Sequence, residues 1–398
     1  MSQYLLIERI KVQNANAASG FTWGFPAITH FLGFSHNLTR KLQSNSEFID
    51  LALGGCIVVA HEQHIHKYKD GVTTRFSQYK TAQYLGLKFD KGILKDPAIN
   101  EEAKMNMTVS LLIPIEGYLG GLQDSLKEFI KNACQIQRLA GGTVLSIENI
   151  DIVDLAKDEH LKSVRRMLLP GFILQDRSSY LAENFLTLQG VNPKAELIEA
   201  WFDFIALKQV ARPSCELIDK YLLNQAEKNE PLSLLNEIWL EHKSQPYQKE
   251  NLPNELITYF VEQQESIDPK ILMQWQNYLA PNEKSTAKWE YVKKPQAGYL
   301  VPIMTGYKAI TDVYPAGEID GARDSETDLC FVEAVHSVGE WQSVHRLKNE
   351  EQWQASVWNY APYETGWYLC QQGLDAEKQE LDLKEWLSGS EHQVQTRE

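Results

Sequence analysis

The chain has 398 residues, of which 43% are hydrophobic, and carries a formal net charge of −14 at pH 7. This length and apolar content support one large or two ordinary domains and exclude a disordered or fibrous protein. The negative charge argues only superficially against a nucleic-acid partner, because the distribution of charge matters more than its total.

The first predicted elements are a strand, a helix and a hairpin. Residues 3–12 read as a strand, and apolar residues at helical spacing predict a helix over residues 26–43. Residues 55–68 begin as a β-rich apolar run. Asp70-Gly71 follows as a turn signal, which predicts a hairpin.

The next elements repeat the pattern of strand and helix. Residues 105–113 alternate strictly, which places every second side chain on the same face of a strand. An amphipathic helix is predicted over residues 122–136. The segment RLAGG (138–142) ends that helix before a strand over residues 143–150.

The order strand, helix, strand, strand, helix, strand is that of the ferredoxin-like fold, an RRM-like antiparallel sheet with two helices on one face. We therefore expect an α+β protein. Many functions use this fold, RNA recognition among them, so the fold does not identify one. The RNA-recognition signature is absent, and the strand over 105–113 offers no aromatic residue for stacking. Any RNA is expected on loops rather than on the bare sheet.

A long helical insertion is predicted next. Residues 191–297 contain no glycine, and several prolines divide them into four or five short helices. With 12 basic and 16 acidic residues, this stretch does not read as a nucleic-acid patch, and it either contacts protein or supports the sheet. The expected domains are a ferredoxin-like domain (1–180), a large helical insertion (181–290), a returning β- and aromatic-rich C-terminal part packed on the first domain (291–373), and an acidic tail (374–398).

Charge is distributed unevenly along the chain. Residues 1–95 carry 11 Lys and Arg against 6 Asp and Glu, whereas residues 296–398 carry 7 against 18. The basic third can face a polyanion, while the acidic part meets a protein or is simply solvated. Five dispersed cysteines indicate reduced thiols. Without a secretory signal or a membrane-length apolar run, the expected location is the cytoplasm, with no membrane contact.

Two groups of histidines are candidates for chemistry. HEQHIH (61–66) places His64 and His66 on one side of a strand, a spacing that zinc can use, but no further ligand is evident. The alternative is a polar strand end leading into a basic hairpin. His30 and His36 lie about 240° apart around a helix, so they cannot act as a pair, although either is a candidate general base. We expect neither a metal nor a cofactor.

Two basic motifs are candidates for phosphate contacts. In RLAGG, paired glycines let the backbone approach a ligand, and Arg138 beside exposed amides suits a phosphate. A helix C-cap made by Gly141 is the alternative, which the motif taken alone favours. In RRMLLPGF, Arg165 and Arg166 are adjacent on a helix and either clamp a phosphate or are solvated.

Eight segments in register closely resemble the Csy2 family, the Cas5-like subunit of the type I-F CRISPR Csy surveillance complex. They run from about residue 4 to residue 347 and omit most of the helical insertion. They are IKVQNANA, FTWGFP, HFLGFSHNL, RLAGGTVLS, RRMLLPGF, GYLVPIMTGYKAI, GEIDGARDSETDLCFVEAV and GEWQSVHRL. The family belongs to the RAMP superfamily, whose members are built on ferredoxin-like domains with a glycine-rich loop.

The resemblance implies a non-catalytic RNA-binding subunit for antiviral defence. Such subunits pair with the large Csy subunit, hold the 5′ handle of the CRISPR RNA (crRNA) and adjoin the first backbone Csy subunit, and they meet target DNA only through the complex. Amides and arginines would contact phosphates, while Trp23 and Phe25 would stack bases or pack the loop. The expected RNA-binding residues are Gln13, Asn14, Asn16, Trp23, Phe25, Lys67, Arg75, Arg138, Gly141, Gly142, Arg165 and Arg166.

Two departures and two rival classes accompany this reading. The helical region is longer than the family leads us to expect, so its protein contacts are open, and an acidic tail follows VHRL. One rival is a RAMP-type, metal-independent endoribonuclease that processes repeat RNA with His30 or His36 as general acid or base. The other is a metal-dependent protein that uses His61, His64 and His66.

Overall fold

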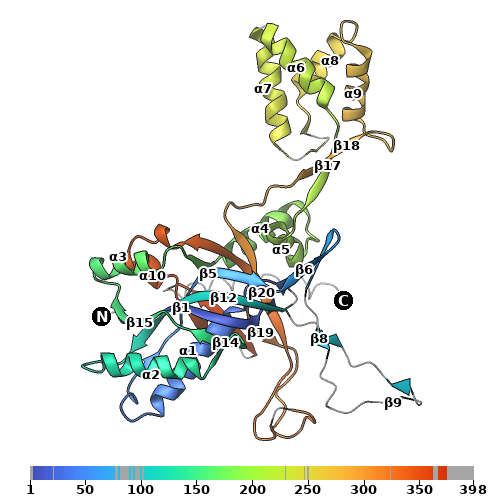
Figure 1. Ribbon diagram of the computed structural model, residues 1–398. Coiled ribbons are helices and arrows are strands. Elements are labelled where there is room, and N and C mark those ends of the chain that lie inside the picture. The colour runs from blue at the N-terminus through green and yellow to red at the C-terminus, as the bar shows by residue number, and fades with distance from the viewer. Residues whose placement is uncertain are drawn as a thin grey trace. The chain divides into compact units, whose positions relative to one another are not determined.

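The computed structural model belongs to the mixed α+β class, as predicted (Figure 1). Two compact units make up the chain, one of residues 1–204 with 296–398 and one of residues 205–295. The predicted acidic tail, 374–398, lies outside the described residues. The structure describes residues 3–20, 22–76, 79–80, 89–90, 93–94, 99–100, 103–228, 230–245, 247–248, 251–322, 324–361 and 366–373.

The first unit is built on a long, curled antiparallel sheet. Its N-terminal part follows the predicted order, and β1 lies between β14 and β12, with β5 beyond β12. The elements of this part are β1 (Gln3–Asn16), α1 (Ile28–Gln43), β5 (Ile57–Ile65), β12 (Lys104–Glu116), α2 (Gln123–Gln135), β13 (Arg138–Leu139) and β14 (Gly142–Ser146).

Beyond β5 the sheet continues through strands from the second half of the chain, in the order β16, β20, β19, β22, β21. These strands are β16 (Phe172–Asp176), β19 (Leu300–Ala309), β20 (Val332–Ser343), β21 (Trp358–Ala361) and β22 (Trp367–Gln372). At its other side, β15 (Asn149–Asp154) pairs with the first half of β1, and β4 (Ala52–Leu53) pairs with the end of β12. The returning segment is therefore part of the same sheet as the N-terminal strands.

Both faces of the central strands are buried for part of their length. On one face, α1 and α2 cover the apolar side chains of β1 and the set on β12 that the alternation predicted, Met105 to Ile113. On the opposite face, α3 (Asp158–Met167) and α10 (Glu350–Gln354) cover Leu6, Ile57 and Leu112. The prediction of a sheet covered on one face only was incomplete, because these helices lie far along the chain from the strands they cover.

The segment RLAGG is a hairpin, so the alternative of a helix C-cap at Gly141, which the motif taken alone favoured, is wrong. Helix α2 already ends at Gln135, and Arg138 and Leu139 pair with Thr143 and Gly142 across a two-residue turn. Ala140 and Gly141 both have positive φ, 50° and 73°, as a type I′ turn requires.

The other short elements of the first unit include the predicted hairpin at Asp70-Gly71. It is formed by β6 (Lys67–Asp70) and β7 (Thr73–Phe76). The remaining elements are β2 (Ala18–Ser19), β3 (Thr22–Trp23), β8 (Tyr79–Lys80), β9 (Phe89–Asp90), β10 (Ile93–Leu94), β11 (Ile99–Asn100), α4 (Ser178–Val191), α5 (Leu197–Ile205) and the 3-10 helix η3 (Val344–Arg346). No helix in the described part of the chain is both long and apolar enough to cross a membrane.

The second unit packs helices α6–α9 around its own apolar core, which includes Trp239, Phe260 and Trp275. Its helices are α6 (Glu216–Lys228), α7 (Glu230–Ser244), α8 (Asn254–Glu262) and α9 (Pro269–Leu279). Pro231 and Pro269 lie in the first turns of α7 and α9, and Pro253 directly precedes α8, whereas Pro213 lies in a strand. At α9 the Asp268 carboxylate accepts a hydrogen bond from the Lys270 amide at 2.8 Å. The unit also contains an unpredicted two-stranded ribbon of β17 (Gln209–Pro213) and β18 (Ala287–Tyr291).

Candidate nucleic-acid interface

The C-terminal end of β1 meets the hairpin β13–β14 at very short range. The Asn16 amide donates to the Ala140 carbonyl at 2.7 Å, and Gln13 pairs with Thr143. A Cβ atom on Gly142 would lie 2.7 Å from both the Ala15 nitrogen and the Gln13 oxygen. Close backbone packing therefore explains this glycine, while the adjacent Gly141 lies open at the turn.

Polar residues at the end of β1 differ in what they offer to a ligand. The register of β1 against β12 shifts between Val12 and Ala15, and Asn14 adopts a φ of 57° there. Its amide donates to Asn106 Oδ1 at 3.1 Å, and its side chain is exposed, as is that of Gln13. Asn16 instead bridges both backbone groups of Ala18, each at 3.1 Å, so its amide group supports the loop.

The loop from β1 to α1 is a small hairpin held by its own hydrogen bonds. Ser19 Oγ donates to the Phe25 carbonyl at 2.8 Å, and the Gly24 amide donates to the Ala17 carbonyl at 2.8 Å. Gly20 has a positive φ, and a side chain there would collide with His336 of β20. The described residues of the predicted N-terminal loop are thus held by contacts within the chain itself.

The two aromatic residues of this loop have different surroundings. Phe25 stacks on Phe31, with ring centroids 5.4 Å apart, and meets the edge of Trp341 at 4.8 Å. Its ring therefore extends the hydrophobic core. Trp23 lies against Phe76, with ring centroids 3.5 Å apart, which joins the loop to the hairpin β6–β7.

That hairpin presents the predicted cations Lys67 and Arg75, both exposed. Arg75 forms an ion pair with Asp70 at 3.1 Å, but the two side chains are 60% and 56% exposed. Exposed ion pairs contribute little, so a phosphate can replace the carboxylate.

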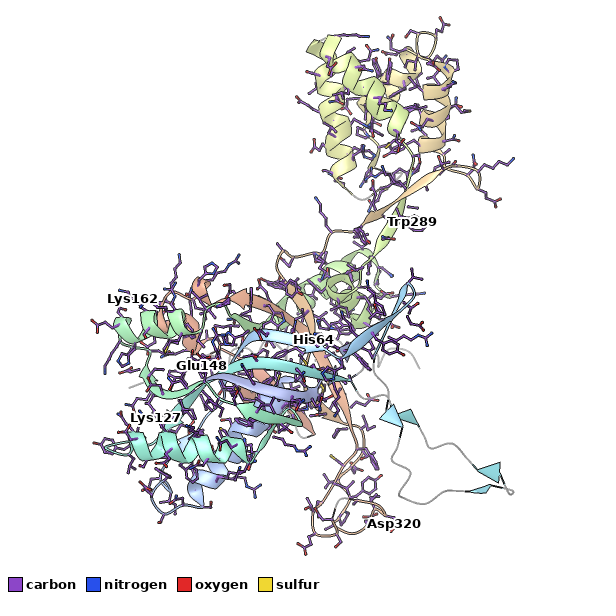
Figure 2. All side chains as sticks on the ribbon, viewed as in Figure 1. His64, Lys127, Glu148, Lys162, Trp289 and Asp320 are labelled. Carbon is purple, nitrogen blue, oxygen red and sulfur yellow. The ribbon has the colours of Figure 1, made fainter. Side chains whose placement is uncertain are left out.

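Sequence reasoning missed a polar surface on the open part of the sheet. Lys11 lies opposite Thr108, and Asn106 lies opposite His64, which Figure 2 shows on β5. Lys11, Asn106 and His64 are exposed. The alternation of residues 105–113 already distinguished this polar face of β12 from the apolar one. It gave no reason to expect Lys11 of β1 beside that face.

The three histidines of HEQHIH do not converge. His64 and His66 lie on one side as predicted, with ring centroids 6.2 Å apart. His61 Nδ1 donates to the Pro170 carbonyl at 2.8 Å, so Nε2 accepts the Ser110 hydroxyl at 2.7 Å. Burial lowers the pKa of His61, which fits this neutral tautomer. Within the described ranges, no group of three or more His, Cys, Asp and Glu side chains is arranged to hold a metal.

The histidines of α1 are also separate from each other. His36 is exposed, whereas His30 is mostly buried, and burial lowers the pKa of its imidazole although the nearby Ala27 carbonyl opposes the shift. They lie on different sides of the helix, as the spacing predicted.

Arg165 and Arg166 are not brought to the other predicted residues. They lie on α3, which packs near β15 and the first half of β1, and Arg165 donates to the His345 carbonyl at 3.0 Å. The structure gathers the other predicted residues around the end of β1 and the hairpins β2–β3, β6–β7 and β13–β14, a surface we call the β1 edge. Exposed polar or cationic side chains of the β1 edge include Lys11, Gln13, Asn14, Lys67, Arg75 and Arg138.

Comparison with known proteins gives a consistent picture. The family model "CRISPR-associated protein (Cas_Csy2)" matches residues 5–245 and 254–370. The chain is also 30% identical over 362 residues to the CRISPR-associated protein Csy2 of Pseudomonas aeruginosa (strain UCBPP-PA14), an alignment that covers 86% of this chain and 88% of that protein. The chain therefore belongs to the Csy2 family of CRISPR-associated proteins.

Proposed function

We propose that this chain is a non-catalytic subunit of a type I-F Csy complex that binds the 5′ handle of crRNA. In this proposal it works in the cytoplasm, pairs with the large Csy subunit, adjoins the first backbone Csy subunit and meets target DNA only through the complex. Family membership supports a place in the complex. The position of β1 between β14 and β12, with α1 and α2 on one face, supports a ferredoxin-like RAMP core.

The observation that carries RNA binding is the convergence of the β1 edge. Lys11, Lys67 and Arg138 are exposed cations that come from three separate elements. The open turn at Gly141 leaves room for a sugar-phosphate backbone, and polar Gln13 and Asn14 lie beside it. Such a surface suits a single-stranded handle, whose phosphates position it and whose unpaired bases offer edges and faces.

The handle assignment is tested by coexpressing the chain with the other Csy subunits and a crRNA. We expect a stable pair with the large subunit and, in the full complex, bound RNA of uniform 5′ sequence. Lys11→Ala with Arg138→Ala should weaken handle binding and reduce the salt slope by about 1.4, since each lost phosphate contact on a single strand removes about 0.7. The slope is measured by titrating labelled handle RNA at several salt concentrations.

Lys131→Ala provides the matched control, because Lys131 is an exposed cation of α2, on the helix-covered side. It should leave handle binding unchanged. Random 5′ ends on the copurified RNA, or equal effects of both variants, would refute the handle assignment. Arg166→Ala tests separately the remaining prediction that α3 contacts RNA.

The endoribonuclease alternative has its own test. His30 and His36 lie on different sides of α1, and burial lowers the pKa of His30, so the helix does not present them as a catalytic pair. We expect no cleavage when purified protein is incubated with repeat RNA. Cleavage that His30→Ala or His36→Ala abolishes would contradict a non-catalytic role.

A further inference from the structure

Two large aromatic side chains lie exposed side by side on the ribbon β17–β18. Trp289 and Tyr291 are 67% and 66% exposed, far more than aromatic residues in a packed core (Figure 2 labels Trp289). They are two residues apart on β18, so they lie on one face, about 7 Å apart along the strand. Their partners on β17 are Ala211 and Gln209, which are too small or too polar to cover the rings.

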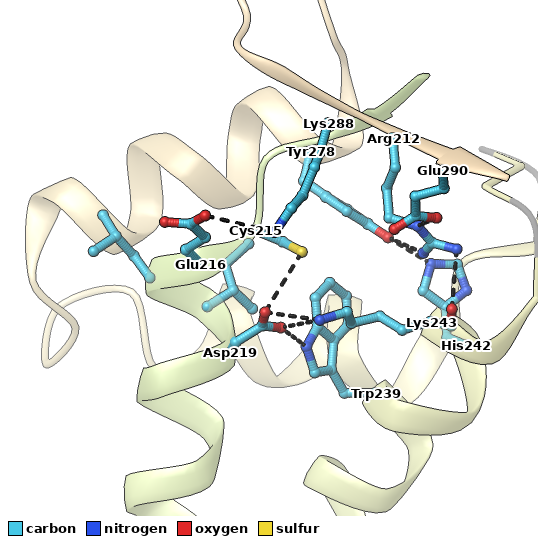
Figure 3. Close-up of polar contacts among 12 residues, drawn as sticks. Arg212, Cys215, Glu216, Asp219, Trp239, His242, Lys243, Tyr278, Lys288 and Glu290 are labelled. Atoms are coloured by element: carbon cyan, nitrogen blue, oxygen red, sulfur yellow. Dashed lines mark hydrogen bonds and ion pairs between the residues drawn. The ribbon is translucent and has the colours of Figure 1, made fainter. Parts of the chain in front are cut away.

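The other face of the ribbon is anchored to the helices (Figure 3). Arg212 is fully buried, and its guanidinium donates to Glu290 at 2.6 Å and to the Tyr278 hydroxyl at 3.0 Å. It also donates to the backbone carbonyls of Lys243 and Gln245. Because Arg212 and Glu290 alternate with Trp289 and Tyr291, the anchor fixes the ribbon with its aromatic face outward. The two rings therefore lie on a strand that the Arg212 contacts hold in place, so a ligand would not have to order a loop in order to bind them.

Cations flank the aromatic pair at both ends. Residues 284–294 contain four lysines and one glutamate, Glu290. The carboxylate of Glu290 is paired with the Arg212 guanidinium. Lys284, Lys293 and Lys294 are exposed, and Lys288 makes only a long ion pair with Glu216, at 3.8 Å between side chains that are both 70% exposed. Residues 191–297 as a whole are net acidic, with 12 basic and 16 acidic residues, so their total charge gives no sign of this basic segment.

We propose that the outer face of the ribbon is a second nucleic-acid site, which binds single-stranded RNA or DNA without sequence preference. Trp289 and Tyr291 would stack two successive bases, while Lys284, Lys293 and Lys294 neutralise phosphates on either side. Neighbouring aromatic rings on a strand, bordered by lysines, are the means by which sheet faces bind single strands. A duplex would not engage the rings, because its bases are already stacked on each other. This site belongs to the second compact unit, whereas the residues of the β1 edge belong to the first.

The test uses the full chain carrying Lys11→Ala and Arg138→Ala, so that binding at the β1 edge does not mask the ribbon. The probes are fluorescein-labelled 12-nucleotide oligouridylate and oligothymidylate, followed by fluorescence anisotropy. Adding Trp289→Ala with Tyr291→Ala should weaken both probes about tenfold or more, because each stacked base contributes a substantial part of the affinity. Lys293→Ala with Lys294→Ala should lower the salt slope by about 1.4.

Two control variants and two further measurements make the outcome decisive. Trp289→Phe keeps a ring and should retain most of the affinity, while Tyr118→Ala removes a ring that is 90% exposed outside the ribbon and should have no effect. Oligouridylate with 5-iodouridine should crosslink to Trp289 or Tyr291, as mapped by mass spectrometry, and thermal unfolding should show that the variants are folded.

Unchanged affinity in the double aromatic variant, or crosslinks confined to other residues, would overturn the ribbon site. Loss of the large Csy subunit on copurification, with oligonucleotide affinity intact, would also overturn it and identify the ribbon as a protein-docking surface. None of these results depends on whether the β1 edge binds the crRNA handle.

Discussion

Asn14 and Gly142 control how β1 and β14 approach each other at the proposed RNA edge. Asn14 takes a positive φ of 57°, a conformation that asparagine tolerates better than most residues. Gly142 lies so close to β1 that a Cβ atom would lie 2.7 Å from two backbone atoms of that strand. The position of Arg138 across the hairpin depends on both residues, since Arg138 and Gln13 pair with the same Thr143.

Gly142→Ala should destabilise the first unit by about 1–3 kcal/mol, because the added methyl group forces β14 away from β1. The neighbouring Gly141→Ala is the matched control. Its φ of 73° disfavours alanine, but nothing lies within 4 Å of the added Cβ, so the cost should stay near 1 kcal/mol. Denaturant unfolding monitored by circular dichroism measures both values. Equal losses in the two variants would mean that the close contact at Gly142 relaxes freely.

The ribbon β17–β18 and the helices α6–α9 form one assembly because Arg212 joins them. Its guanidinium donates hydrogen bonds to a carboxylate, a hydroxyl and two carbonyls, which would otherwise lack this donor. A second polar group lies beside it, where Asp219 accepts from the Trp239 indole at 2.7 Å and pairs with Lys243 at 2.7 Å. These contacts link α6 to α7 beside Trp239 of the apolar core.

Arg212→Met should destabilise the second unit by about 3 kcal/mol, because it removes a buried guanidinium and leaves the Tyr278 hydroxyl and two backbone carbonyls without their donor. The milder Glu290→Gln keeps an acceptor for the guanidinium and should cost less. Hydrogen exchange of amides in α7 and α9, followed by mass spectrometry, reports the loss. Faster exchange in β1 or β12 as well would show that Arg212 is not specific to this unit.

The two compact units have separate apolar cores, so each is expected to unfold in its own transition. Histidines that are partly or fully buried occur in both units. Burial lowers the pKa of His30 and His61 in the first unit, and of His242 in the second, where the charge of Arg212 adds to the effect. All three imidazoles are therefore neutral in the folded protein near pH 7.

Acidification should destabilise both units. In the unfolded chain these histidines titrate near pKa 6.5, whereas in the folded protein their pKa values are lower, so the unfolded state binds more protons as pH falls below 6.5. The stability present above pH 6.5 is then lost toward the lower, folded-state pKa values. The denaturant midpoints of both transitions should be lower at pH 5.5 than at pH 7.5. His61→Gln should reduce this difference between the two midpoints for the first unit. Midpoints that do not change with pH would contradict the neutral assignment.

Local sequence patterns predicted the helices, strands and turns that depend on residues close together in the sequence. Apolar periodicity located α1, α2 and β12 within one to three residues, and Asp70-Gly71 marked a hairpin because its backbone preference is local. The helices of the insertion were predicted in kind, but β17 and β18 were not, since their pairing joins residues about 80 positions apart.

Contacts between distant residues decided the rest. The sequence predicted that RLAGG, the N-terminal loop and the basic hairpin contact RNA. The fold brings these three segments together, whereas Arg165 and Arg166 lie apart from them on α3. RLAGG became a hairpin rather than a helix cap because β1 offers β14 a partner along its edge. Composition could not separate the lysines of residues 284–294 from the acidic helices around them, because only strand pairing and the burial of Arg212 turn Trp289 and Tyr291 to one exposed face.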